Sequence, residues 1–270
     1  MGNVAQTNVA SLNAQRNLFR TNNALSTSFQ RLASGFRINS AKDDAAGLQI
    51  SNQLSAQIVS LNVGIRNAND GISLAQTAEG ALQEVTNLLL RAKELASQAA
   101  SGQTTSDGRV ALNAEYTELK AEITRISTDT SFGGEILLDG ANNYSIQIGD
   151  TTGSTDITVT TVDISAVSTA LGTLTTAALG QTELDVINTQ LTSVDTTRGD
   201  LGAIQNRLTS TISNLQNVVE NVSASRSRIR DTDFAAETAN LAKNQILQQA
   251  GLSVLAQANA SNQSILALLQ

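Results

Sequence analysis

Two pairs of closely spaced carboxylates are the residues of this sequence best suited to chemistry. Asp43 adjoins Asp44, and Asp231 stands two residues before Asp233. Paired acids can act as general acid and base. However, the chain contains neither His nor Cys, which excludes Ser-His-Asp and Cys-His catalysis, HExxH zinc sites and disulfides. Acids are also common at helix N-termini, where they interact favourably with the helix dipole. We therefore predict a non-enzymatic chain with no catalytic residue, cofactor or metal.

Charge and hydropathy exclude two classes of partner. The net charge of -7 and the isoelectric point near 4.6 do not suit a phosphate backbone, so we expect no nucleic acid partner. No segment approaches the roughly 20 apolar residues of a membrane span, so we expect no membrane insertion. The N-terminal sequence MGNVAQTNVASLNAQRNLFR lacks the apolar stretch of a cleavable signal. Export would therefore need a system that reads an uncleaved N-terminal region.

The composition favours long packed helices. Aromatic residues make up only 3%, Trp is absent, and the apolar residues are mainly Ala, Leu, Ile and Val. Such small aliphatic side chains suit helices that pack closely along their length. The chain contains no Pro, so no helix is interrupted by a missing amide donor.

An amphipathic helix is predicted near the N-terminus, because apolar residues recur on roughly one face. These residues are Val9, Leu12, Leu18, Leu25, Phe29 and Leu32. The pattern ends at Gly35. Ser40 and Asp43, three residues apart, resemble a capping box that opens the next helix.

A much longer helix is predicted from about Asp44. Apolar steps near three and four continue from Leu61 to Ala99, which indicates a helix of roughly 55 residues and about 80 Å. The segment 101–108 is typical of a chain reversal. The pattern then restarts over 112–126, so a shorter helix can fold back on the long one.

The period changes between Ser131 and Gly180. Tyr144, Ile146 and Ile148 alternate in a region rich in Thr, Gly, Asn and Asp, which predicts one or two β-hairpins. The Ser- and Thr-rich stretch 151–176 is a candidate for O-linked glycans at an exposed tip.

Two more helices complete the predicted order. Helical spacing from Leu184 to Ile229 indicates a second long helix that can pair with the first. The last stretch, 231–270, is amphipathic and carries no charge after Lys243. Because isolated helices are marginal in water, we expect this last helix to need a packing partner.

These patterns predict a mainly α fold. It consists of a long antiparallel helical rod with a small β-hairpin region, and of a terminal coiled-coil-like helix pair formed by the N- and C-termini. The terminal pair would remain underburied in a monomer. In a polymer each buried Leu or Ile would contribute roughly 1.5 to 3 kcal/mol, so assembly would be coupled to folding.

Three segments closely resemble the conserved terminal regions of bacterial flagellins. Residues 33–54 (ASGFRINSAKDDAAGLQISNQL) and 66–82 (RNANDGISLAQTAEGAL) resemble the N-terminal region. Residues 225–259 (SRSRIRDTDFAAETANLAKNQILQQAGLSVLAQAN) resemble the C-terminal region. Both regions occur in the family's order at the two ends of the chain. The resemblance implies a short flagellin that lacks large outer domains.

The resemblance also implies a division of the chain. Residues 1–43 would form an N-terminal filament-core segment and spoke. Residues 44–180 would form the N-terminal part of a rod domain with a β-hairpin tip, 181–230 its C-terminal long helix, and 231–270 the C-terminal filament-core helix.

The terminal helices are the expected filament-core interface. The predicted contact residues are Val9, Leu12, Leu18, Leu25, Phe29, Leu32, Leu247, Val254, Leu255, Ile265, Leu268 and Leu269. The alternative is an ordinary intramolecular helix pair. We favour assembly, because two lightly charged ends with apolar stripes lack enough partner surface within one chain.

A group of charged residues lies where the core helix joins the rod. These spoke residues are Arg31, Arg37, Lys42, Asp43 and Asp44. They are predicted to hold the connection through ion pairs. The alternative is that they are solvated charges of little energetic effect.

The stretch 88–96 resembles the flagellin patch bound by a vertebrate innate immune receptor. Arg91, Leu95 and, across the helical hairpin, Glu115 match its positions, whereas Leu90 and Lys93 depart from the commonest pattern. Packing between neighbouring rods is the alternative role of this patch.

The resemblance further implies partners and a location. The chain would form a homopolymer, the helical flagellar filament that serves swimming motility, and would lie outside the cell. Its transient partners would be the type III flagellar export apparatus, an export chaperone and a cap protein. The alternatives are a hook-filament junction protein and a secreted helical adhesin or effector.

Overall fold

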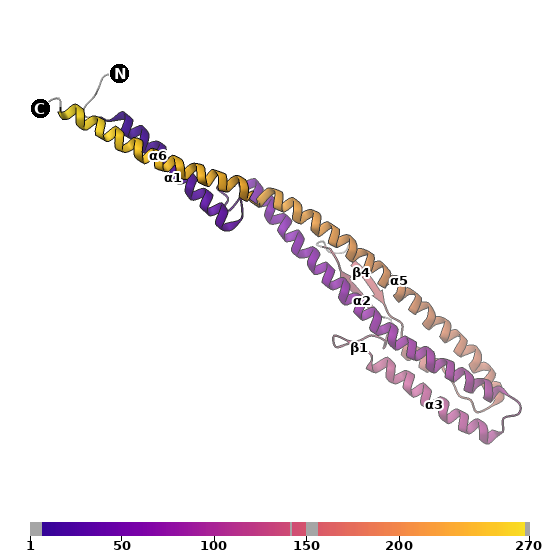
Figure 1. The fold of residues 1–270 in the computed structure, drawn as a ribbon. Coiled ribbons are helices and arrows are strands. Elements are labelled where there is room, and N and C mark those ends of the chain that lie inside the picture. Colours follow the sequence, from indigo (N-terminus) through magenta and orange to yellow (C-terminus); the bar gives the residue numbers. More distant parts are fainter. Residues whose placement is uncertain (1–6, 141, 150–155, 268–270) are drawn as a thin grey trace. The chain divides into compact units, whose positions relative to one another are not determined.

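The computed structural model describes residues 7–140, 142–149 and 156–267, with side chains described as far as Ser261. The helices are α1 (Val9–Ser34), α2 (Ala45–Ala100), α3 (Ser106–Asp129), α4 (Ile164–Ala170), α5 (Ala177–Arg230) and α6 (Phe234–Ala267). The strands are β1 (Ser131–Phe132), β2 (Glu135–Ile136), β3 (Asn143–Gln147) and β4 (Asp156–Thr160) (Figure 1). The predicted mainly α fold with antiparallel helices, β-hairpins and a terminal helix pair is confirmed.

The chain forms two compact units. The terminal unit contains the chain up to Ala56 and from Asn221 onward, and the central unit contains Gln57–Glu220. The predicted long helices are present as α2, with 56 residues, and α5, with 54 residues.

Antiparallel packing of α2, α3 and α5 forms the core of the central unit. Ile187, Val194, Leu201 and Leu208 of α5 recur at steps of seven and are fully buried, which is the spacing of a coiled-coil stripe. Apolar residues of α2 at steps of three, four and seven cover this stripe, among them Leu82 and Leu89. The core is therefore built from small aliphatic side chains, as the composition predicts.

Two separate antiparallel hairpins form in the region predicted to hold one or two. β1 pairs with β2, and the two residues between them, Gly133 and Gly134, have φ values of 62° and 95°. Glycine takes such angles without steric cost, as a two-residue hairpin turn requires. β3 pairs with β4 from Asn143 opposite Thr160 to Gln147 opposite Asp156.

The β3–β4 hairpin packs against α2 at a small residue. The Asn67 side-chain amide donates a hydrogen bond of 2.8 Å to the Gln147 carbonyl oxygen. A Cβ added at Gly64 would overlap the Ile148 carbonyl oxygen. Only a residue without a side chain fits at position 64, so this glycine lets the hairpin approach the helix backbone.

Besides the predicted hairpins, the region between Ser131 and Gly180 contains a short helix, α4, which sequence reasoning missed. Asp163 caps this helix by accepting a hydrogen bond of 3.1 Å from the Ala166 amide. Ile164 and Val167 bury its inner face. The helix has only 7 residues, too few to show a clear period within a Thr-rich stretch.

In the terminal unit, α1 ends where the sequence pattern predicts. The Asn8 side chain accepts a hydrogen bond of 3.0 Å from the Ser11 amide and caps the N-terminus. Gly35 follows the last residue with a left-handed φ of 74°, and its amide donates to the Arg31 carbonyl oxygen at 2.8 Å. A glycine in this conformation is a common helix C-cap.

The predicted capping box does not open α2. Asp43 accepts hydrogen bonds from the Asn39 and Ser40 amides, which close a separate turn. Asp44 caps the helix instead, by accepting a bond of 2.9 Å from the Gly47 amide. The side chains of Asp43 and Asp44 therefore stabilise two successive local structures.

The two segments that connect the helices of the terminal unit are hydrogen-bonded to each other. Phe36 and Asp231 form an isolated antiparallel bridge. The Arg37 amide donates to the Arg230 carbonyl oxygen at 2.7 Å. The Arg230 guanidinium also lies 4.1 Å from the centre of the Phe36 ring, a favourable cation–π distance. These contacts join the segment that follows α1 to the segment that precedes α6.

Candidate assembly interface on the terminal helices

One narrow stripe of each terminal helix packs against the other helix. On α1 the stripe consists of Ser11, Ala14, Leu18, Thr21, Leu25, Ser28 and Leu32. On α6 it consists of Glu237, Leu241, Asn244, Gln248, Gly251, Leu255 and Ala258, which are the only covered side chains of this helix up to Ser261. Both stripes alternate steps of three and four, as in a coiled coil. We call this intrachain contact the seam.

Polar side chains fix the register of the seam. The Asn8 side-chain amide donates a hydrogen bond of 2.9 Å to the Ala258 carbonyl oxygen. The Gln248 side-chain amide donates one of 2.8 Å to Asn22 Oδ1. Since residue numbers rise along one helix as their partners' numbers fall along the other, α1 and α6 are antiparallel.

A partly buried ion pair marks the end of the seam near the connecting segments. Arg31 Nη1 lies 3.6 Å from Glu237 Oε2, and the two side chains are 32% and 10% exposed. Arg31 also contributes, after the Ser40 and Asn39 amides, to lowering the pKa of Asp43. Arg31 therefore pairs with α6 at this end of the seam.

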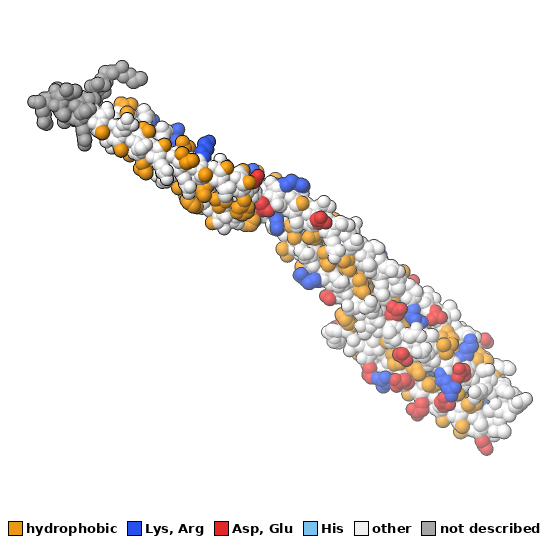
Figure 2. Space-filling model, in the orientation of Figure 1, with side chains coloured by type: hydrophobic (Ala, Val, Ile, Leu, Met, Phe, Trp, Pro, Cys, Tyr) orange, Lys and Arg blue, Asp and Glu red, His pale blue; other side chains and the backbone are white. Residues whose placement is uncertain are grey.

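Large apolar side chains cover much of the outer surface of the terminal pair. Those exposed on the two helices are Val9, Leu12, Phe19, Phe29, Phe234, Ile246, Leu247, Leu252 and Val254. Phe19 is 68% exposed. Figure 2 shows hydrophobic side chains along this pair, with few acidic side chains among them. Many exposed large apolar side chains on one pair of helices are typical of a protein–protein contact.

The structure divides the predicted filament-core residues into two groups. Leu18, Leu25, Leu32 and Leu255 lie in the seam, whereas Val9, Leu12, Phe29, Leu247 and Val254 are exposed. The side chains of Ile265, Leu268 and Leu269 lie outside the described residues. Sequence reasoning missed Phe19, although it follows Leu12 by seven residues.

The spoke residues make mainly local or backbone contacts. The Arg37 guanidinium donates to the Ile229 carbonyl oxygen, and Asp43 and Asp44 accept from backbone amides. Lys42 is exposed and forms no ion pair with the described residues. Only Arg31 of this group forms one there, with Glu237.

Three of the four acids singled out for chemistry accept hydrogen bonds from backbone amides. Besides Asp43 and Asp44, Asp233 accepts hydrogen bonds of 2.9 and 3.2 Å from the Ala235 and Ala236 amides at the start of α6. Across the described ranges, no group of three or more acidic side chains could hold a metal ion. None of the described helices is long and apolar enough to cross a membrane.

The residues that resemble a receptor-binding patch are only partly on the surface. Arg91 is exposed and bonds to Glu115 Oε1 at 2.7 Å and to Glu94 Oε2 at 2.7 Å. Leu95 is only 1% exposed and belongs to the core. Of the two residues on α2 that match the patch, only Arg91 is therefore available at the surface in this structure.

The arrangement at the chain ends is that of a structural protein that associates with copies of itself. Residues 5–143 match the bacterial flagellin N-terminal helical region, and residues 184–269 match the bacterial flagellin C-terminal helical region. The chain belongs to the bacterial flagellin family. It is a structural subunit of the extracellular flagellar filament, a homopolymer that serves motility.

Individual flagellins are similar over nearly the whole chain. A flagellin of Halalkalibacterium halodurans is 43% identical, over 97% of this chain and 98% of that protein. Flagellin A of Vibrio cholerae is 38% identical, over 98% of each chain. The crystal structure of Bacillus cereus flagellin matches with a TM-score of 0.52 and 31% identity, over 56% of this chain and 88% of that chain.

Proposed function

We propose that this flagellin joins neighbouring subunits through the outer faces of α1 and α6, while the seam holds the two helices together within one chain. The observation that carries the proposal is the exposure of large apolar side chains on both helices, outside the seam. Val9, Leu12, Phe29, Leu247 and Val254, five of the residues predicted for the filament core, are among them.

The composition of the seam supports this division of roles. Its members include Ser11, Ser28 and Gly251, which bury little apolar area. Burial of one large apolar side chain contributes roughly 1.5 to 3 kcal/mol. Covering the outer faces in a polymer therefore adds stability that the seam alone does not supply, and this couples assembly to ordering of the ends.

A surface substitution tests the proposal. Phe19→Ser together with Val254→Ser removes two exposed apolar side chains without touching the seam. We expect the variant to fold as the parent does, by circular dichroism, and to raise the critical concentration for polymerisation at least tenfold. The matched control is Val110→Ser in α3, because Val110 is 65% exposed but lies in the central unit. A Phe19/Val254 variant that polymerises like the control would contradict the proposal.

The family division of the chain belongs to the same proposal. Residues 1–43 and 231–270 would act as filament-core segments, and residues 44–180 and 181–230 as the domain around that core. The flagellin relatives, which are similar over nearly the full length, support a filament subunit over a hook-filament junction protein or a secreted adhesin or effector.

The same family membership supports transient partners and a non-catalytic role. We assign the export apparatus, an export chaperone and a cap protein as partners on this ground. Capping of helices by Asp44 and Asp233 supports the absence of catalysis, because their carboxylates already accept backbone hydrogen bonds.

A second candidate function is recognition by the vertebrate innate immune receptor for flagellin. The exposed Arg91–Glu115 pair supports it, since a charged pair on the surface can exchange partners on binding. Arg91→Ala should reduce receptor signalling by purified monomer at least tenfold. Arg125→Ala, which removes a comparable exposed ion pair on α3, should leave signalling unchanged. Equal signalling by the two variants would exclude the Arg91–Glu115 pair as part of the receptor-binding site.

A further inference from the structure

Helix α1 carries a second coiled-coil stripe beside its seam residues. The members are Leu12, Gln15, Phe19, Asn22, Ser26, Phe29 and Ala33, each one residue after a seam position. They keep the same alternating steps of four and three. All seven line two open hollows on the surface of α1. We call this set the outer stripe of α1. It has the spacing to receive another helix, yet no described helix covers it.

Helix α6 carries a corresponding second stripe. Its members are Asn240, Lys243, Leu247, Ala250, Val254 and Gln257, each one residue before a seam position, and all are exposed. We call this set the outer stripe of α6. Its largest apolar members, Leu247 and Val254, are seven residues apart.

The two outer stripes face opposite sides of the terminal pair. Consecutive residues of a helix are turned by about 100°. In an antiparallel pair, positions with the same offset from the seam lie on the same side, and positions with opposite offsets lie on opposite sides. The α1 stripe has an offset of one residue forward, and the α6 stripe an offset of one residue backward.

We propose that the outer stripe of α1 in one subunit packs against the outer stripe of α6 in the next subunit. This inference rests on the proposed function and assigns its contact surfaces. Because the stripes face opposite sides, each subunit can receive one neighbour on α1 and offer α6 to another. In such a heterologous contact, each added subunit presents a free copy of the same surface. The contact therefore generates a ring or an open helical polymer.

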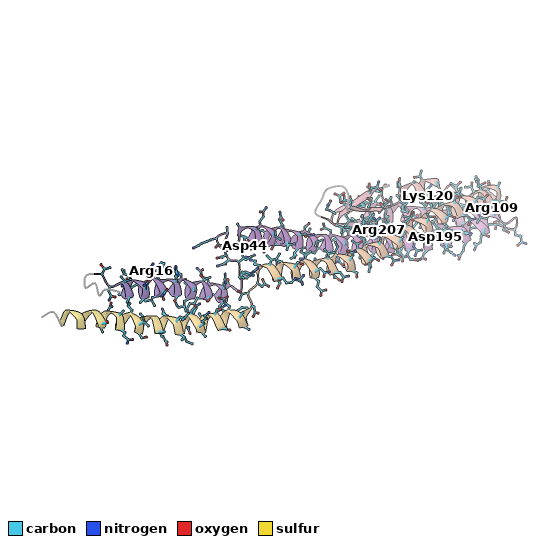
Figure 3. The ribbon with its side chains drawn as sticks, turned by 90° about the horizontal axis from the view of Figure 1, so that it is seen from above. Arg16, Asp44, Arg109, Lys120, Asp195 and Arg207 are labelled. Atoms are coloured by element: carbon cyan, nitrogen blue, oxygen red, sulfur yellow. The ribbon has the colours of Figure 1, made fainter. Side chains whose placement is uncertain are left out.

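The low charge of the two outer stripes favours their contact with each other. The α1 stripe is uncharged, and the α6 stripe carries only Lys243 at one end. Their contact therefore buries almost no charge and avoids the cost of desolvating one. Arg16 and Arg20 lie beside the α1 stripe, and Arg16 points away from α6 (Figure 3).

The lengths and directions of the two outer stripes also allow them to pack against each other. At 1.5 Å per residue, the α1 stripe is about 32 Å long and the α6 stripe about 26 Å. Subunits that share one orientation bring α1 of one and α6 of the next together antiparallel, which is the arrangement of the seam. The intersubunit contact thus repeats the intrachain packing with a shift of one residue.

Cysteine cross-linking tests the assignment, since the chain contains no Cys of its own. Full-length protein with Phe19→Cys and either Leu247→Cys or Val254→Cys is polymerised and treated with a short thiol-reactive cross-linker. The two positions face opposite sides within one chain, so a cross-link between them joins two subunits. We expect a ladder of dimers, trimers and larger species on a denaturing gel.

Two controls make the test specific. Asn23→Cys with Ile246→Cys places thiols on exposed positions opposite the seam, beside the outer stripes and not within them, and should give at least tenfold less ladder. Phe19→Cys alone should give no dimer, because the α1 stripe does not meet itself. A ladder of equal strength from the Asn23/Ile246 pair, or efficient dimers from Phe19→Cys alone, would overturn the assignment.

A second measurement covers the case in which a double variant does not polymerise. Protein with Phe19→p-benzoylphenylalanine is mixed as a minor fraction into unmodified filaments and irradiated. The cross-linked peptide should be 244–270, with the bond near Leu247 to Val254. A bond elsewhere overturns the stripe assignment while leaving the terminal helices as the interface. Filament growth without residues 236–270 would overturn the proposed function itself.

Discussion

At the scale of single residues, a buried hydroxyl and carboxylate connect two helices of the central unit. Tyr116 Oη donates a hydrogen bond of 2.8 Å to Glu183 Oε2, and the Gly172 amide donates one of 3.0 Å to the same oxygen. Burial, and then the neighbouring carboxylate, raise the pKa of Tyr116 far above its usual range. The sequence pattern predicts Tyr116 as an inward residue, but not its partner. Glu183 is 67 residues away, and only the folded chain brings the two together.

This pair gives a prediction on alkaline stability. The raised pKa of Tyr116 contributes stability that is fully present below the unfolded value of about 10 and is lost as the pH rises above it. Tyr116→Phe should lower the free energy of unfolding by about 1 to 3 kcal/mol at pH 7, because Glu183 loses a donor. It should also make the decline of stability above pH 10 shallower.

Urea unfolding at several pH values measures both effects. Tyr144→Phe is the control, because the Tyr144 hydroxyl donates to the Ile136 carbonyl oxygen at an exposed site. The control should change the stability at pH 7 by less than about 1 kcal/mol. Equal effects of the two substitutions would contradict the role assigned to the buried pair.

The Arg31–Glu237 pair gives a second prediction at this scale. Arg31→Glu places two carboxylates together at a partly buried site and should weaken the terminal pair by about 1 to 2 kcal/mol, less than for a fully buried pair. Polymerisation followed by light scattering should slow. Combining Arg31→Glu with Glu237→Arg should restore most of the rate. Failure of the double variant to recover would contradict the stabilising role assigned to the Arg31–Glu237 pair.

At the scale of elements, apolar periodicity predicts the long helices well and the short features poorly. The apolar period of α2 persists over many turns, so the sequence predicts this helix well. The helix ends at Ala100, just before the predicted reversal. Helix α4 is too short to show one. The seam and the outer stripe of α1 both have coiled-coil spacing. The sequence alone therefore did not reveal that Leu18 and Leu25 pack within the chain while Leu12 and Phe29 stay exposed.

Two glycines of α2 give a prediction for the β3–β4 hairpin. Gly64→Ala should destabilise the central unit by about 1 to 3 kcal/mol, because its Cβ would overlap the Ile148 carbonyl oxygen. Gly80→Ala should stabilise the same helix by about 0.5 to 1 kcal/mol, because no atom lies near its Cβ position. Thermal unfolding of the two variants measures the contrast. Stabilisation by both would exclude close docking of the hairpin at Gly64.

At the scale of the whole molecule, stability is distributed unequally between the units. The central unit buries a continuous aliphatic core, whereas the terminal pair leaves most of α6 exposed. Limited proteolysis of the monomer should therefore remove both ends first and leave a fragment of roughly residues 45–230. The same treatment of filaments should leave the ends intact. A full-length monomer that resists digestion would contradict this distribution.

Polymerisation of a chain that lacks residues 236–270 tests the central claim most directly. The truncated protein and the intact protein are incubated with short filament seeds and examined by electron microscopy, and circular dichroism reports their helical content. We predict that the truncated chain stays soluble and helical but neither forms filaments nor extends seeds, while the intact chain does both. Normal filaments from the truncated chain would contradict the claim that α1 and α6 carry assembly.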